Sequence, residues 1–198
     1  MIVGVLALQG DVREHISALS DCGVGAIEVR TLSELESIQA LVIPGGESTT
    51  ISKLARAFGL FETLQERIRT GMPVYGSCAG LILLADRVLD AIVGQESFGG
   101  LNVTARRNAF GRQVDSFESD IEFKGITGPK FRAIFIRAPW IEDCGEGVEV
   151  LAQIDGHPVA VRSKNLLATS FHPELTSDNR IHRYFVETIC SRALRVGV

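Results

Sequence analysis

The chain has 198 residues, of which 45% are hydrophobic and 22% charged, and its formal net charge is -4. This length suits one domain with its own apolar core and leaves no room for a second catalytic domain, while the acidic balance argues against nucleic acid or an anionic membrane as a partner. The sequence also lacks a basic leader segment and any apolar run near the roughly 18 residues that a membrane span needs. We therefore expect a cytoplasmic protein, with one domain over residues 1–198, that acts on a small molecule or another protein.

The first half of the chain alternates short apolar runs with helical patterns. Because continuously apolar strands separated by helices are typical of a parallel sheet covered on both faces, we expect an α/β fold here. Asp11 directly follows Gly10, Ser48 comes two residues after Gly46, and both are the expected N-caps. The patterns predict strands at Ile2–Leu8, Ala26–Arg30, Ala40–Ile43 and Pro73–Tyr75, and helices at Asp11–Cys22 and Ser48–Thr70.

The chain from Phe98 to Ala168 is rich in strand patterns, and we expect antiparallel hairpins there that extend the sheet. A last strand at Leu166–Phe171 and a closing helix from about Asp178 to Leu194 return to the α/β pattern. The strands expected in the β-rich part are Asn102–Arg106, Asp120–Lys124, Phe131–Ile136, Val148–Ile154 and Val159–Arg162.

Cys78 lies between a short apolar strand and an apolar helix, with Gly76 and Gly80 on either side in a G-x-C-x-G pattern. This is the thiol form of the nucleophile elbow, in which glycines allow a turn too tight for a Cβ. At the start of the helix from Ala79, unpaired backbone N–H groups favour a thiolate and stabilise an oxyanion. The pattern predicts a nucleophile. The other cysteines, none in a C-x-x-C pair, are expected to be free thiols without a zinc or disulfide role: Cys22, Cys144 and Cys190.

A thiolate that attacks an amide needs a proton donor for the leaving nitrogen, and histidine is the usual one. His172 ends the last apolar strand, and the alternation of a strand predicts that His172 and Glu174 point to the same side. Cys78 and His172 both end strands of the expected parallel sheet, where sites gather. We interpret the three as a Cys-His-Glu triad. The other histidines are expected to be solvated or structural on helices (His15, His182) or part of a turn (His157).

Several segments resemble a known family. G-S-C-A-G at residues 76–80 and S-F-H-P-E at residues 170–174 resemble the class I, triad-type glutamine amidotransferases. Other segments resemble, more specifically, the glutaminase subunits of pyridoxal 5'-phosphate synthase: L-Q-G-D-V-R-E-H at 8–15, P-G-G-E-S-T-T at 44–50, R-N-A-F-G-R-Q-V-D-S-F-E at 107–118 and F-I-R-A-P at 135–139. These segments cover nearly the whole chain.

The resemblance implies a three-layer, flavodoxin-like α/β domain with a mostly parallel central sheet, helices on both faces and an antiparallel β-rich extension. It implies that L-glutamine is hydrolysed without a metal or cofactor. The ammonia would pass to a separate (β/α)8-barrel synthase subunit that makes pyridoxal 5'-phosphate, in a hetero-oligomeric complex. Asp11 to His15 and the first helix would lie near that interface.

Free glutamine carries an ammonium and a carboxylate, so its site needs an acid and a base besides the amide pocket. Glu47 is placed to meet the ammonium and Arg107 to meet the carboxylate. The turn P-G-G-E-S allows close backbone approach to a ligand, and it lacks the G-K-[ST] ending of a phosphate loop. We expect an oxyanion hole from the N–H groups of Gly46 and Ala79. With the resemblance, the remaining substrate-binding residues are Gly45, Ser48, Ile136 and Arg137.

Three alternatives stay open. A glutaminase subunit of another synthase, such as that for imidazole glycerol phosphate, would share the triad but should lack the segment at 107–118. A non-catalytic module on the same fold would have lost a triad residue. A cysteine hydrolase or protease would not need the pair Glu47 and Arg107.

Overall fold

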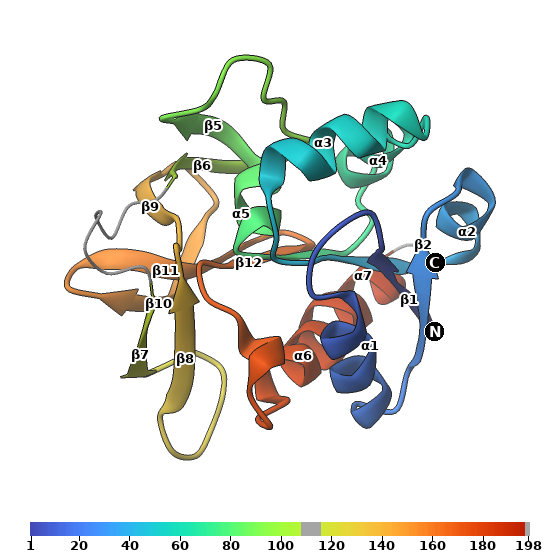
Figure 1. Ribbon diagram of the computed structural model, residues 1–198. Helices are drawn as coiled ribbons and strands as arrows, with labels where there is room; N and C mark the ends of the chain where they lie inside the picture. The colour runs from blue at the N-terminus through green and yellow to red at the C-terminus, as the bar shows by residue number, and fades with distance from the viewer. Residues whose placement is uncertain (108–115, 197–198) are drawn as a thin grey trace.

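The computed structural model, which describes residues 1–107 and 116–196, has helices on both faces of a central sheet (Figure 1). Five strands of this sheet are parallel, in the order β12-β4-β3-β1-β2. This is the 2-1-3-4-5 order of flavodoxin-like sheets with β12 as the fifth strand, so the expected fold class is confirmed. The parallel strands are β1 (Ile2–Leu6), β2 (Gly25–Val29), β3 (Ala40–Ile43), β4 (Val74–Ser77) and β12 (Leu166–Thr169).

Two apolar clusters lie between the helices and the sheet. In β3, Leu41 and Ile43 belong to one cluster and Ala40 and Val42 to the other, because successive side chains of a strand point to opposite faces. One face is covered by α2 (Leu32–Ser37), α3 (Ser48–Ala57), α4 (Phe61–Arg69) and α5 (Ala79–Leu84). The other is covered by α1 (Val12–Asp21), α6 (Arg180–Tyr184), the π-helical η2 (Phe185–Cys190) and α7 (Ser191–Val196).

The β-rich part of the chain forms three additions to the parallel sheet. The hairpin of β10 (Glu149–Ile154) and β11 (His157–Ser163) extends the central sheet through β12, as expected. The other strands form two small separate sheets instead of joining it. These are β5 (Ala85–Leu89), β6 (Leu101–Arg106) and β9 (Trp140–Cys144) in one, and β7 (Ser116–Ile121) with β8 (Phe131–Ile136) in the other. All strand pairs in these additions are antiparallel except β5 with β6, which is parallel.

Several expected elements differ in the structure. The helix predicted over Ser48–Thr70 is two helices, because Gly59 has a φ of 69° and ends α3 with a hydrogen bond from its N–H to Arg56 O. The strand predicted at Asp120–Lys124 lies earlier, at β7, where Phe117 stacks on Phe135 of β8. The N-cap of α3 is Glu47 rather than Ser48, since its carboxylate accepts the N–H groups of Thr49 and Thr50.

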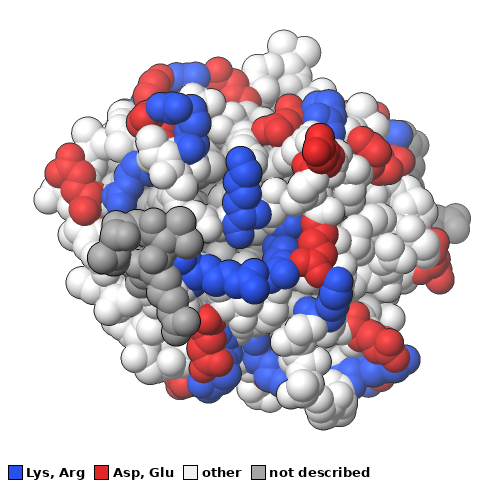
Figure 2. All heavy atoms as spheres, turned by 180° about the vertical axis from the view of Figure 1, so that it is seen from behind, with Lys and Arg blue, Asp and Glu red and all other residues white. Residues whose placement is uncertain are grey.

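On the face shown in Figure 2, acidic and basic side chains are interspersed, with several Lys and Arg side chains near the middle. This face therefore does not present a field of a single sign. None of the helices that the structure describes is long and apolar enough to cross a membrane.

Candidate active site

Cys78 forms the elbow between β4 and α5. Its φ of 49° and ψ of -98° place it in a sparsely populated region, which is strained for a residue with a Cβ. Both flanking glycines are required here: a Cβ on Gly76 would lie 2.5 Å from the Gly80 carbonyl, and one on Gly80 would lie 2.3 Å from Ile43 O. The Cys78 N–H donates to Thr169 O at 2.8 Å, which ties the elbow to β12.

His172 follows β12 and faces the elbow. Its Nδ1 lies 2.8 Å from Glu174 Oε1, and its backbone N–H donates to Ile134 O of β8. The pairing that the sequence predicts is therefore present, but the predicted reason was wrong. Residues Pro173–Leu175 form a 3-10 turn (η1), so the turn rather than strand alternation brings the carboxylate back to the ring.

In His172 and Glu174, polar contacts shift the pKa in the direction that favours the charged form, against the effect of burial. Burial alone would lower the pKa of His172, but Asp11, Cys78 and Glu174 hydrogen-bond to the ring and raise it to about 12. Burial would raise the pKa of Glu174, yet the adjoining His15 and His172 rings bring it well below its ordinary value. The contacts therefore favour an imidazolium beside a carboxylate.

The triad opens into a cavity of about 390 Å³ at the carboxyl ends of the parallel strands. Cys78 follows β4, His172 follows β12, Gly46 follows β3, and Gln9 and Asp11 follow β1, so the cavity spans the point where the strand order reverses. Its walls hold nearly all the predicted site residues. The lining is Gln9, Asp11, Gly46, Glu47, Ser48, Cys78, Ala79, Ile82, Arg107, Ile136, Arg137, His172 and Leu175.

The two charged residues expected to hold glutamine lie together on the cavity wall. Arg107 Nη2 is 3.2 Å from Glu47 Oε1, and its Nη1 donates to Gln95, whose amide donates to Ser48 Oγ. Partial burial would raise the pKa of Glu47, but the hydrogen bonds from Thr50 and Thr49 lower it. The expected acid and base therefore lie close enough together to bind the two ends of one amino acid.

Two of the other expected site residues, Arg137 and Gly46, have positive φ angles. Arg137, directly after β8, has a φ of 42°, and Gly46 has a φ of 151°. Gly46 lies under the Gln9 side chain, whose Oε1 accepts the Glu47 N–H at 2.6 Å. Gly45 does not line the cavity: a Cβ there would lie 2.3 Å from His172 Cε1, so this glycine makes room for the ring.

Part of the predicted segment at 107–118 cannot be assigned a place, because residues 108–115 lie outside the described residues. The sequence predicts a solvated or structural role for His15 and His182 and no place near the triad. Both are fully buried, and His15 Nε2 lies 3.5 Å from Glu174 Oε1. Their signal is weak but present: His15 shares a helix face with Ala18 and Leu19, three and four positions on, and both are buried.

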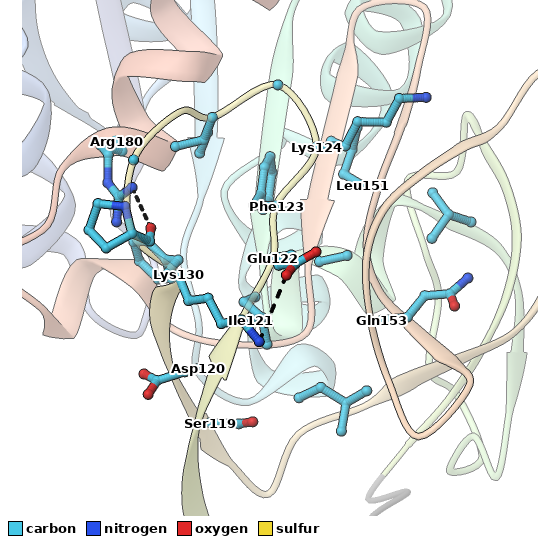
Figure 3. Close-up of a pocket in the computed structure, with 18 of the residues that line it drawn as sticks. Ser119, Asp120, Ile121, Glu122, Phe123, Lys124, Lys130, Leu151, Gln153 and Arg180 are labelled. Carbon is cyan, nitrogen blue, oxygen red and sulfur yellow. Dashed lines mark hydrogen bonds and ion pairs between the residues drawn. The ribbon is translucent and has the colours of Figure 1, made fainter.

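A larger hollow of about 970 Å³ lies elsewhere, between the ends of β7 and β8, the loop at 122–130 and β10 (Figure 3). Two of its charged groups bind neighbouring protein groups rather than converge on the hollow. Lys130 lies 3.8 Å from Glu122 (Figure 3), and Arg180 donates to the backbone carbonyl oxygens of Thr127 and Pro129. It is less suited to bind a small polar molecule than the cavity at Cys78.

One group of ligand-type side chains in the described part of the chain is compact enough to hold a metal ion. Its ligand atoms lie within 4.8 Å of one another, and its members are Asp11, His172 and Glu174. The His172 nitrogen in this group is Nδ1, which faces both carboxylates and lies 2.8 Å from Glu174 Oε1, as the ring nitrogen of a catalytic triad does. We assign the group to the triad.

Comparisons with known proteins agree with this geometry. The model of the SNO glutamine amidotransferase family matches residues 5–191. The chain belongs to this family. A "Pyridoxal 5'-phosphate synthase subunit PdxT" from Acidothermus cellulolyticus is 59% identical over 196 residues, covering 96% of this chain and 95% of the relative. A protein of the same name from Mycolicibacterium vanbaalenii is 60% identical over 190 residues, covering 94% and 97%.

Solved structures give the same family and fold. A crystal structure described as a glutamine amidotransferase has a TM-score of 0.90 and 50% identity, and the match covers 96% of this chain and all of that chain. A structure of PurLQS from Thermotoga maritima has a TM-score of 0.68 at 14% identity, over 94% and 97% of the two chains. The second likeness shows the fold alone.

Proposed function

We propose that this chain is the glutaminase subunit of a pyridoxal 5'-phosphate synthase: it hydrolyses L-glutamine to L-glutamate and ammonia and supplies the ammonia to a separate synthase subunit. The observation that carries the proposal is the elbow cysteine facing His172 in a cavity that also holds the pair Glu47 and Arg107. A thiol hydrolase of another kind would not need an acid and a base placed for a free amino acid.

In the proposed reaction, the Cys78 thiolate attacks the side-chain amide carbon of glutamine, and the C–N bond breaks as His172 protonates the departing ammonia. Water, deprotonated by the same ring, then attacks the γ-glutamyl thioester, which releases glutamate and restores the thiol. Backbone N–H groups of Gly46 and Ala79 are the proposed oxyanion hole. Glu174 holds the ring in the tautomer with a proton on Nδ1, which leaves Nε2 for the chemistry.

We assign the remaining cavity residues to substrate recognition. Glu47 binds the ammonium and Arg107 the carboxylate of glutamine, in both cases by charge-assisted hydrogen bonds. The backbone around Gly46, Ser48 and the turn at Ile136 and Arg137 completes the proposed wall. Gly45 contributes by leaving room for the His172 ring.

The proposed partner is the synthase subunit of a cytoplasmic complex, a (β/α)8 barrel by the family resemblance. Its support is the name shared by relatives that are 59% and 60% identical over nearly their whole length. The same names disfavour the alternative of a glutaminase for imidazole glycerol phosphate synthase. The intact triad disfavours a non-catalytic module.

Glutamate release by the Cys78→Ala variant, with and without the synthase subunit, tests the proposal. We expect no release above background from this variant, because the attacking sulfur is gone. The matched control is Cys144→Ala, which removes a half-buried free thiol on β9 outside the cavity and should keep wild-type activity. Glutamate release that survives in Cys78→Ala refutes the proposal.

A further inference from the structure

Two histidines continue the triad into the protein interior. His15 on α1 and His182 on α6 are both 0% exposed, although neither lines the cavity. His15 Nδ1 lies 2.9 Å from His182 Nε2, and His15 Nε2 lies 3.5 Å from Glu174 Oε1. The rings therefore form a series from His182 through His15 to the carboxylate that holds His172.

The contact between the two rings limits where their protons lie. One of the two facing nitrogens, His15 Nδ1 or His182 Nε2, must donate to the other. If His15 Nδ1 is the donor in a neutral ring, its Nε2 lone pair faces a carboxylate and repels it. If His182 Nε2 is the donor, His15 carries its proton on Nε2 and presents an N–H to Glu174. For a neutral His15 ring, the second arrangement is the one that satisfies both contacts.

The burial of Glu174 makes such a donor valuable. Its carboxylate side chain is 0% exposed, and a buried carboxylate is costly unless several donors satisfy it. His172 provides one donor at 2.8 Å. Ser77 Oγ lies 3.2 Å and 3.3 Å from the two oxygens, but it is equally close to Phe171 O and has a single proton to share.

The other polar side chains that the structure describes near Glu174 either hydrogen-bond to other groups or are themselves negatively charged, so they do not donate to its carboxylate. The Tyr75 hydroxyl lies 2.9 Å from Thr169 Oγ1, which in turn donates to Phe171 O. Asp11 adds a second carboxylate, with Oδ2 3.4 Å from His172 Nδ1, so it competes with Glu174 for the ring. His15 Nε2 has no hydrogen bond of good geometry within the described residues, which leaves Glu174 Oε1 as its acceptor.

We infer that His15 is a positioning residue of the reaction: with its tautomer set by His182, it donates Nε2–H to Glu174 and keeps this carboxylate, rather than Asp11, aligned with His172. The inference rests on the triad of the proposed function and deepens it. His15 touches neither the substrate cavity nor the sulfur, so it acts only through the orientation of Glu174 and His172.

Three variants of the full chain, assayed for glutamate release with the synthase subunit present, test the inference. His15→Met keeps a similar volume but removes the donor, and we expect kcat to fall about tenfold or more, as for other groups that orient a reacting residue, with KM for glutamine unchanged. His15→Gln restores an amide N–H near the Nε2 position and should recover most of the loss. Tyr75→Phe is the matched control, because the Tyr75 ring packs against both histidine rings and the change removes only a buried hydroxyl that lies 2.9 Å from Thr169 Oγ1.

The outcomes separate a positioning role from a structural one. Loss of kcat in His15→Met, recovery in His15→Gln and unchanged kcat in Tyr75→Phe support the inference. Unchanged kcat in His15→Met, or equal losses in His15→Met and His15→Gln, overturns it. If Cys78→Ala abolishes activity while His15→Met keeps it, the inference fails and the proposed function stands.

A measurement on the wild-type chain covers the case in which His15→Met does not fold. Nitrogen chemical shifts of ¹⁵N-labelled histidine distinguish a protonated from an unprotonated ring nitrogen. We expect His15 with its proton on Nε2, and the same tautomer for His182. A neutral His15 with its proton on Nδ1 contradicts the inference.

Discussion

Glu174 is one of the groups that keep a proton on the His172 ring. It lies between two rings, and with Asp11 and Cys78 it raises the pKa of His172 above the ordinary 6.5. Because an imidazolium can protonate a leaving amine and an imidazole cannot, this shift keeps the proton donor available over a wide range of alkaline pH.

The change Glu174→Gln tests this dependence. Loss of the negative charge removes a group that stabilises the imidazolium, so the pKa of His172 falls and the alkaline limb of kcat/KM for glutamine moves to lower pH, by about one unit or more. Rates of glutamate release between pH 7 and pH 12 measure the shift. Glu187→Gln, at an exposed position paired with Arg183, is the control and should leave the limb in place. An unmoved limb in Glu174→Gln contradicts this account.

At the scale of elements, the turn between β3 and α3 determines where the His172 ring can lie. A Cβ on Gly45 would lie 2.3 Å from His172 Cε1, and the backbone of Gly45 is not left-handed, so Gly45→Ala pushes on the ring without straining its own turn. We expect kcat for glutamate release to fall up to about 100-fold, the cost of a displacement near 1 Å.

The control for Gly45→Ala is Gly23→Ala. Gly23 has a φ of 78° and nothing within 4 Å of its added Cβ, so that variant loses about 1 kcal/mol of stability from backbone strain and keeps its activity. Thermal unfolding and kcat, measured on both variants, separate the two effects. A Gly45→Ala variant with full kcat would show that the ring has more freedom than the structure indicates.

Some helices and strands of the structure were predicted from the sequence and others were not. The buried parallel strands were predicted because both of their faces are apolar. The triad was predicted from the glycines around Cys78 and from the position of His172 at a strand end, two residues before Glu174. The elements α2, β5 and β9 were missed: β5 (A-D-R-V-L) exposes most of its residues, and α2 is a single short helix held by the capping box of Thr31 and Glu34. His15 was assigned a solvated or structural role because Arg13 and Glu14 precede it, and only the fold shows that α6 and Glu174 face its ring.

At the scale of the whole molecule, the paired helices α1 and α6 bury a histidine that cannot easily be charged. The pKa of His182 falls from 6.5 to about 3, chiefly because the ring is buried, although the nearby Glu174 opposes the change. The unfolded chain has no such environment, so it binds a proton at a pH where the folded chain does not. Acidification between these two values therefore favours unfolding.

Urea unfolding of the wild type and of His182→Gln at pH 7, 6 and 5 measures this linkage. Below the ordinary pKa of 6.5 the wild type should lose stability as the pH falls, by at most about 1.4 kcal/mol per pH unit, whereas His182→Gln should show a smaller slope. His157→Gln is the control, because His157 stacks on Trp140 at the start of β11, outside the α1–α6 contact, and should keep the wild-type slope. Equal slopes for the wild type and His182→Gln would mean that His182 takes up its proton in the folded protein as readily as in the unfolded chain. The contact between α1 and α6 would then impose no electrostatic cost at acid pH.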